Sequence, residues 1–333
     1  MSTETLSLDA IETLAMQALT AVGTTPENAR YLAQATADTE ADGIASHGLA
    51  YIPIYCEHVQ CGKVDGQATP VVSRPKSGAI VVDAANGFAH PAIEAGFDAL
   101  IQAAQDNGIA VLSIKNSYNC GVLGVHTQKM ARAGVIAIGA TNAPASIAPS
   151  GGKKPVVGTN PISMATPDGQ GGVGLLIDQS ASVIAKSEVM KHQREGQPIP
   201  LGWALDSEGQ PTTDAAAGLA GSMAPAGDYK GVGVALIVEV LAAALSGSNL
   251  GTQASPFSGT AGGPPGTGQC FIAIDPGVAS DQAAARLAQL MESVLIQEGA
   301  RLPGQNRAAK RKLAAQQGVA VNVATLERIR ALL

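Results

Sequence analysis

The chain has 333 residues, 46% of them hydrophobic and 14% charged, and a formal net charge of −6 at pH 7. These values are typical of a globular protein large enough for two domains or lobes. The acidic balance argues against a nucleic-acid partner, because a general nucleic-acid surface needs clustered Lys and Arg. The one basic cluster, residues 307–312, is interpreted as a solvated helix face, with a contact to an anionic ligand as the alternative. The most apolar run, residues 231–247, is interrupted by Glu239 and is too short to cross a bilayer, so we expect no membrane partner.

The N-terminal stretch MSTETLSLDA is polar and acidic, without the basic and apolar segments of a secretory signal. The four cysteines form no CxxC pair, and the five histidines show no metal-ligand spacing. We therefore expect a cytoplasmic protein with reduced thiols and no bound metal.

Three helices are expected in the N-terminal part of the chain. Residues 7–22 place apolar side chains on one face at helical spacing. Residues 24–43 follow as a second helical stretch, with Thr25 as its N-cap and Pro26 at the first helical position. A third helix is expected from about residue 46 to residue 62.

The middle of the chain changes to short β-rich runs bounded by turn residues. These runs span residues 78–86, 108–116, 133–142, 172–178 and 270–276. A helical stretch over residues 90–108 separates the first two, and this strand–helix–strand order taken alone favours a doubly wound parallel sheet. Further helices are expected over 229–246, over 280–299 and at the C-terminus, whereas the Gly/Pro-rich residues 255–269 predict a loop.

No glycine motif of this chain identifies a nucleotide site. A GxGxxG fingerprint directly after a strand is absent, as is a GxxxxGK[ST] loop. Residues 115–126, KNSYNCGVLGVH, follow a predicted strand and lead into a helix, where free backbone amides can bind a pyrophosphate. An ordinary capped turn fits the same pattern equally well. In PAGDYKG, residues 225–231, Lys230 lies at a helix N-terminus against the helix dipole, which hints at a bound anion.

The residues around His47 suggest a role in proton transfer. Ser46 and Gly48 flank it, which provides a hydroxyl partner and room for a ligand. An ordinary histidine pKa of about 6.5 suits proton donation near neutral pH. A purely structural role near a helix start is the alternative, and Thr159 and Asn160 in GTNPIS allow the same two interpretations.

Seven ordered segments cover nearly the whole chain and carry a family resemblance. They are ADGIASHG, VDAANGFAHPA, GGKKPVVGTNPIS, IDQSASVIAKSEV, GWALDSEGQPTTD, APAGDYKG and RLPGQ. Together they resemble the type-2 malate/L-lactate dehydrogenase family, and within it most of all the reductases of Δ1-piperideine-2-carboxylate and Δ1-pyrroline-2-carboxylate. Other members of that family act on malate, lactate, ureidoglycolate, sulfolactate or diketogulonate. The resemblance implies NAD(P)H-dependent reduction of the C=N bond of a cyclic imino acid. An NAD(P)-dependent 2-hydroxy-acid dehydrogenase of the malate, lactate or sulfolactate type is the alternative.

The resemblance also implies a fold that differs from the one suggested by the strand–helix–strand order. It is an α/β (α+β) fold with a non-Rossmann nucleotide-binding domain, built on a mostly antiparallel sheet flanked by helices. This sheet domain would span residues 73–277, and a helical lobe would combine residues 1–72 with residues 278–333. The family further implies a homodimer, a small 2-imino or 2-keto acid as substrate, and NADP as the favoured cofactor, with NAD also possible.

The resemblance assigns roles to individual residues. It makes Ser46, His47 and Glu188 catalytic, with His47 as the proton donor. The implied substrate contacts are Tyr51, Thr159, Lys186 and Ser187. The implied cofactor contacts are Asn119, Cys120, Gly121, Val122, Leu123, Asp178, Gln179, Ser180, Asp228, Tyr229, Arg301, Gly304 and Arg307.

Two positions depart from the family pattern. Many members carry arginine at the position of Tyr51, where it would hold the substrate carboxylate; tyrosine cannot form a bidentate ion pair. Lys186 is the nearest replacement by motif. Most 2-hydroxy-acid members carry lysine at the position of Glu188, whereas the cyclic-imine reductases carry aspartate. An acid there suits a protonated C=N bond, which is positively charged.

Overall fold

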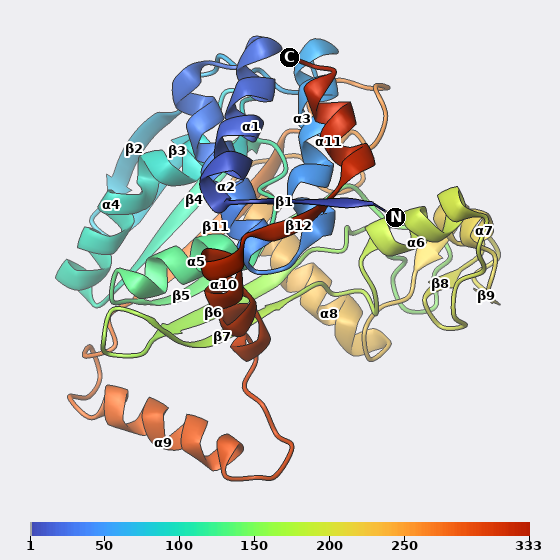
Figure 1. The fold of residues 1–333 in the computed structure, drawn as a ribbon. Helices are drawn as coiled ribbons and strands as arrows, with labels where there is room; N and C mark the ends of the chain where they lie inside the picture. Colours follow the sequence, from blue (N-terminus) through green and yellow to red (C-terminus); the bar gives the residue numbers. More distant parts are fainter. Residues whose placement is uncertain (1) are drawn as a thin grey trace.

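The computed structural model describes residues 2–333 and is built around a seven-stranded sheet (Figure 1). In spatial order its strands are β2 (Val71–Lys76), β3 (Ala79–Asp83), β4 (Ile109–Ser117), β11 (Thr267–Ile274), β5 (Ile136–Thr141), β6 (Ile162–Pro167) and β7 (Val173–Gln179). Neighbouring strands of this sheet are antiparallel except β3 and β4, which are parallel. The mostly antiparallel sheet is therefore confirmed, and the parallel sheet suggested by the strand–helix–strand order is wrong.

Strand β11 explains why that order misleads. The βαβ unit made of β3, α4 (Ala89–Asn107) and β4 has the expected parallel pairing. Strand β11 then inserts between β4 and β5 and pairs antiparallel with both. Its first residues fall in the stretch predicted as loop, which was wrong for residues 267–269. The amide of Gly268 donates to Asn142 Oδ1 at 2.8 Å, a long-range bond that local composition does not reveal.

Helices cover both faces of the sheet. Alternation along β11 places Phe271 and Ala273 in the core under α4 and α5 (Leu123–Arg132). Cys270 and Ile272 point to the opposite face, where they pack with Val238 and Ala242. That face is covered by α8 (Tyr229–Val238) and the π-helical segment Glu239–Ala244 that continues it.

Strands from the two ends of the described chain lie side by side (Figure 1). Strand β1 (Thr3–Leu6) pairs antiparallel with β12 (Val319–Asn322), and α11 (Val323–Arg330) packs with α1 (Leu8–Ala21). Helix α2 (Pro26–Ala41) begins as predicted, because Thr25 accepts the amide N–H of Asn28. The third predicted helix starts late. Two short 3-10 turns, Ala45–His47 and Leu49–Tyr51, precede α3 (Ile52–Gln60) because Gly48 interrupts the helical backbone with ψ −135°.

A smaller region carries a three-stranded sheet of two-residue strands, β8 (Ala204–Leu205), β9 (Pro211–Thr212) and β10 (Ser222–Met223). Helices α6 (Lys186–Glu195) and α7 (Ala215–Ala220) pack together beside it. Near the C-terminus, α9 (Ala283–Leu295) stands out from the body, while α10 (Gln305–Gln317) lies against it (Figure 1). Over residues 2–333, none of the helices combines the length and apolar character that a membrane span requires.

Candidate active site

Ser46 and His47 lie together on the first 3-10 turn. Ser46 Oγ is 3.0 Å from His47 Nδ1, so the hydroxyl fixes the orientation of the imidazole. The His47 ring is half-buried and parallel to the ring of Tyr51, with centroids 5.8 Å apart. Burial lowers the pKa of His47 below its usual range, and the negative charge of Asp178 partly opposes this effect. A neutral imidazole that can take up a proton close to a carboxylate is suited to acid–base chemistry.

Neighbouring elements hold this turn in place. Glu40 Oε1, from α2, accepts the amide N–H of Leu49 at 2.7 Å. A Cβ atom on Gly48 would lie 2.2 Å from the same oxygen, so only glycine fits between the two segments. From α10, Arg311 forms ion pairs with Asp38 and with the buried Asp42, just before the turn begins.

The predicted cofactor turn, residues 119–123, has a well-defined backbone. Asn119 Oδ1 accepts the amide N–H of Gly121 at 2.6 Å, and Gly121 has φ +66°, a conformation that favours glycine. Helix α5 then starts at Leu123, and Val122 at its N-cap gives no side-chain hydrogen bond. The first amides of α5 are thus left without a side-chain cap, as expected at a site for an anionic group.

Asp178 and Arg307 form an ion pair next to this turn. The Arg307 guanidinium lies 2.8 Å from Asp178 Oδ2, and the two side chains are 23% and 9% exposed. A Cβ atom on Gly124 would lie within 2.7 Å of both groups, so the start of α5, the end of β7 and the start of α10 meet here. Interpreting residues 307–312 as a solvated helix face is wrong for Arg307 and Arg311, because both pair with carboxylates.

Backbone hydrogen bonds bring Thr159 next to two predicted cofactor segments. The carbonyl of Thr159 accepts the amide N–H of Ala181 at 2.8 Å, and the carbonyl of Ala181 accepts that of Ala226 at 2.8 Å. Ser180 Oγ, beside Ala181, lies 3.0 Å from Ser182 Oγ. Asp228 follows as the N-cap of α8 with φ +57°, and Tyr229 after it is exposed.

The start of α6 combines a cation with an unpaired hydroxyl. Lys186 is half-buried, burial lowers its pKa, and no carboxylate in residues 2–333 lies within ion-pair distance of it. Ser187 Oγ is buried without a hydrogen-bond partner in the described chain. Ala185 at the N-cap provides no side-chain cap. These features match a site for a carboxylate.

Some predicted site residues add no ion pair to this arrangement. Arg301 and Gln179 are exposed, and within residues 2–333 neither the side chain of Arg301 nor that of Glu188 forms an ion pair. Gly304 packs against Leu176 of β7, where a Cβ atom would lie 2.7 Å from Leu176 Cβ.

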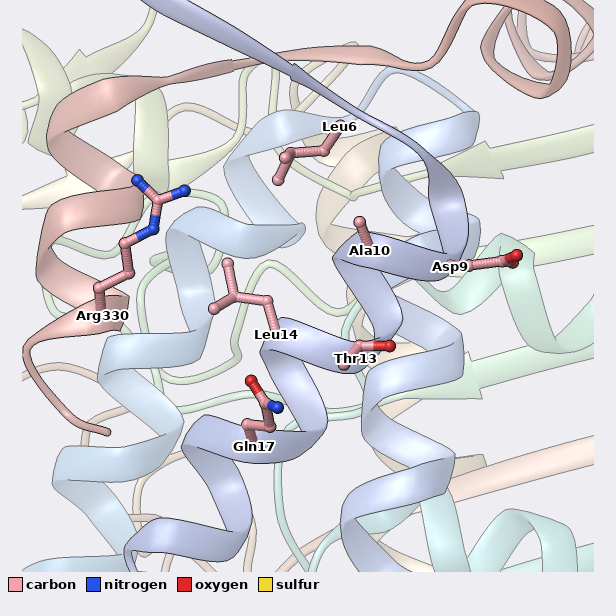
Figure 2. A pocket seen from close by; sticks show the side chains of 7 residues that line it. All are labelled: Leu6, Asp9, Ala10, Thr13, Leu14, Gln17 and Arg330. Atoms are coloured by element: carbon pink, nitrogen blue, oxygen red, sulfur yellow. The ribbon is translucent and has the colours of Figure 1, made fainter.

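One surface hollow is separate from all of these residues. It has a volume of about 350 Å³ and lies where β1 and α1 meet α11 (Figure 2). Arg330 of α11 and Leu14 of α1 face each other across it, and no predicted site residue lines it (Figure 2).

Comparison with known proteins decides the family. The family model for malate/L-lactate dehydrogenase matches residues 6–330. The chain belongs to this family. It is accordingly an oxidoreductase, like the named relatives below.

Relatives in the malate/L-lactate dehydrogenase family differ in the substrates that their names state. The chain is 45% identical to the (2R)-3-sulfolactate dehydrogenase (NADP(+)) of Chromohalobacter salexigens, over 92% of either chain. It is 39% identical to the Δ1-pyrroline-2-carboxylate/Δ1-piperideine-2-carboxylate reductase of Pseudomonas putida, over 92% of this chain and 90% of the relative. The crystal structure of Δ1-piperideine-2-carboxylate reductase from Pseudomonas syringae superposes with a TM-score of 0.93 and 34% identity, covering 99% of this chain and all of the other.

Reasoning from sequence missed two residues next to the candidate site, Asn160 and Glu239. Asn160 was considered as a polar contact and not carried further, and Glu239 was noted only as an interruption of an apolar run. The structure joins them by a hydrogen bond. An acid inside a strongly apolar helix was the available signal, because a buried charge requires a specific partner.

Proposed function

We propose that this chain is an NADPH-dependent reductase of a cyclic imino acid of the Δ1-piperideine-2-carboxylate or Δ1-pyrroline-2-carboxylate type. NADPH, when bound, supplies the hydride that reaches C2 of the substrate. His47 donates the proton to the substrate nitrogen, Ser46 orients the imidazole, and Glu188 favours the positive charge of the protonated C=N bond. NAD is the alternative cofactor.

The number of positively charged side chains among the proposed substrate contacts supports this choice of substrate. Lys186 is the one cation among the proposed substrate contacts Tyr51, Thr159, Lys186 and Ser187. Arg307, in the neighbouring cofactor region, is already paired with Asp178. A single free cation suits a substrate with one carboxylate, whereas a dianion such as a sulfonated oxo acid would require a second cation.

Residues of the proposed cofactor site fit the nucleotide in two places. The uncapped start of α5, with Asn119, Cys120, Gly121, Val122 and Leu123, supplies free amides for its phosphates. Asp228 and Tyr229 at the start of α8, with the segment Asp178–Ser180, would line its other side; Arg301, Gly304 and Arg307 would close it. This arrangement is a nucleotide site outside the Rossmann class.

The exposed face of α8 supports a homodimer. Leu236, Ile237, Val240 and Leu245 are 48%, 55%, 58% and 62% exposed. The first two lie on α8, Val240 lies on the π-helical segment and Leu245 directly follows it. An apolar stripe of this kind on an oxidoreductase is expected to be covered by a second copy of the chain.

We also propose a two-lobe organisation, with residues 1–72 and 278–333 in one lobe and 73–277 in the other; Met1 lies outside the described residues. Pairing of β1 with β12 and the packing of α1 with α11 support the first lobe.

We further propose a cytoplasmic location, which is in keeping with four free cysteines, Cys56, Cys61, Cys120 and Cys270.

A substrate panel tests this proposal. Purified protein is assayed for NADPH oxidation with each cyclic imino acid and with pyruvate, oxaloacetate and 3-sulfopyruvate. The proposal predicts the highest kcat/KM for a cyclic imino acid. Turnover of the oxo acids without imine reduction would overturn it.

A second candidate is supported by a specific observation, the 45% identity to a sulfolactate dehydrogenase. In that case the chain oxidises (2R)-3-sulfolactate with NADP(+). The same panel, run in the oxidative direction with sulfolactate, selects between the two.

A further inference from the structure

Glu239 is a buried carboxylate without a cationic partner. It is 7% exposed and opens the π-helical segment Glu239–Ala244. Within residues 2–333 it forms no ion pair with Lys, Arg or His. Its oxygens instead accept two hydrogen bonds, from Asn160 Nδ2 at 2.7 Å and from the amide of Gly251 at 2.6 Å. A buried carboxylate is costly unless such donors satisfy it, so loss of either hydrogen bond would leave a buried oxygen unpaired.

Burial and several hydrogen bonds hold the Asn160 side chain in one orientation. It is fully buried, and its amide also donates to the carbonyl of Ala235 at 2.9 Å and accepts the N–H of Ala143 at 3.0 Å. Its backbone has φ +36°, which is unfavourable for a residue with a side chain. Such strain persists only where the surroundings over-determine it, and it is concentrated at functional sites.

The residue before Thr159 is equally constrained. A Cβ atom on Gly158 would lie 2.4 Å from the carbonyl oxygen of Ala143 and 2.5 Å from Asn160 Oδ1. Glycine therefore lets the turn lie flat against Ala143. Thr159 is held between this contact and the strained Asn160, while its carbonyl binds Ala181.

We propose that Glu239 is a positioning residue that sets the conformation of Thr159 through Asn160. Its carboxylate holds the Asn160 amide, and the amide holds the left-handed backbone that follows Thr159. A π-helical segment beginning at Glu239 fits this role, because such segments recur at functional sites. This inference rests on the proposed function, in which Thr159 contacts the substrate.

Glu239→Gln tests the role with little change of shape. The new amide nitrogen can only donate, yet it faces Asn160 Nδ2 or the Gly251 amide, which are also donors. One hydrogen bond is therefore lost. We expect kcat/KM for the imino acid to fall about 10- to 100-fold, mainly through KM, since small misplacements of a substrate contact have effects of this size. The Kd for NADPH should stay unchanged, and deuterium exchange of residues 156–163 should accelerate.

Two further variants keep the test decisive. Asn160→Gly relieves the strained backbone but removes the amide; we expect the same loss of kcat/KM, with no additional loss in the double variant. If Glu239→Gln does not fold, Asn160→Gly carries the test alone. Asn28→Ala is the matched control: it removes two buried hydrogen bonds far along the chain from this turn and should lower Tm without changing KM.

The outcomes separate the two proposals. A wild-type protein with no imine reduction overturns the proposed function, and the exchange measurement still decides the role of Glu239. Unchanged KM together with unchanged exchange in Glu239→Gln and Asn160→Gly would overturn the positioning role, even if the wild type is active.

Discussion

The rings of His47 and Tyr51 are parallel to within 4°, with centroids 5.8 Å apart. Tyr51 in turn contacts the buried Tyr55 edge to face, at 4.8 Å between centroids. Burial raises the pKa of Tyr51 to about 12, so its hydroxyl stays protonated and can donate at neutral pH. Tyr51 thus packs its ring against His47 and offers a neutral hydrogen-bond donor beside it.

The variant Tyr51→Phe should distinguish the contribution of the Tyr51 hydroxyl from that of its ring. The ring contact with His47 is retained, so kcat should change little. Loss of one donor should raise KM for the imino acid about 3- to 10-fold, the usual value of a single hydrogen bond. Steady-state kinetics at saturating NADPH measure both constants. A large drop in kcat with constant KM would show instead that the hydroxyl takes part in the chemistry.

Asp178→Asn should alter the pH dependence of reduction. The charge of Asp178 raises the pKa of His47 and opposes the lowering by burial, so its removal lowers that pKa further. In the proposed mechanism, reduction requires a protonated His47, so the rate falls as pH rises through the pKa of His47. We therefore expect the falling limb of kcat against pH to move to lower pH. Asp168→Asn, in an exposed turn, is the control and should leave the limb in place; an unshifted limb in Asp178→Asn contradicts the coupling.

Glu40→Gln should stabilise the protein at neutral pH. Burial raises the pKa of Glu40 above its ordinary 4.5, an effect that the hydrogen bond from Leu49 only partly opposes. A carboxyl with a raised folded-state pKa contributes stability below 4.5, and this contribution is lost as pH rises through the folded-state pKa. The amide variant keeps an oxygen for Leu49 and has no such loss. Its Tm should exceed that of the wild type at pH 8, and the difference should vanish below pH 4.5; a lower Tm at pH 8 would argue against this account.

Ile237→Glu should weaken the proposed dimer. Placing a charge within the exposed apolar stripe of α8 disfavours its burial against a second copy. Light scattering after size-exclusion chromatography should show a shift from dimer to monomer. Leu333→Glu, which alters an equally exposed leucine at the C-terminus, should remain dimeric. A wild type that is monomeric at all concentrations would remove the proposal.

Local signals in the sequence predicted the helices and several strands, while long-range contacts decided the rest. Thr25 and Pro26 predicted the start of α2 because capping is a local interaction. The position of β11 between β4 and β5 depends on pairing over more than a hundred residues, which no local pattern encodes. Two-residue strands such as β8 are too short for any periodicity.

In the candidate site, too, local contacts were predictable from the sequence and long-range contacts were not. Ser46 and His47 are sequence neighbours, and their contact was predictable. The pair formed by Asp178 and Arg307 joins residues that are 129 positions apart, and only the fold brings them together.

Replacing His47 tests the central claim most directly. The kcat of Δ1-piperideine-2-carboxylate reduction is compared between wild type and His47→Gln, with the Kd for NADPH measured on the same samples. A proton donor in contact with the substrate predicts a fall in kcat of about 10²- to 10⁴-fold with an unchanged Kd. A variant that reduces the imine as fast as the wild type would contradict the assignment of His47 as the proton donor.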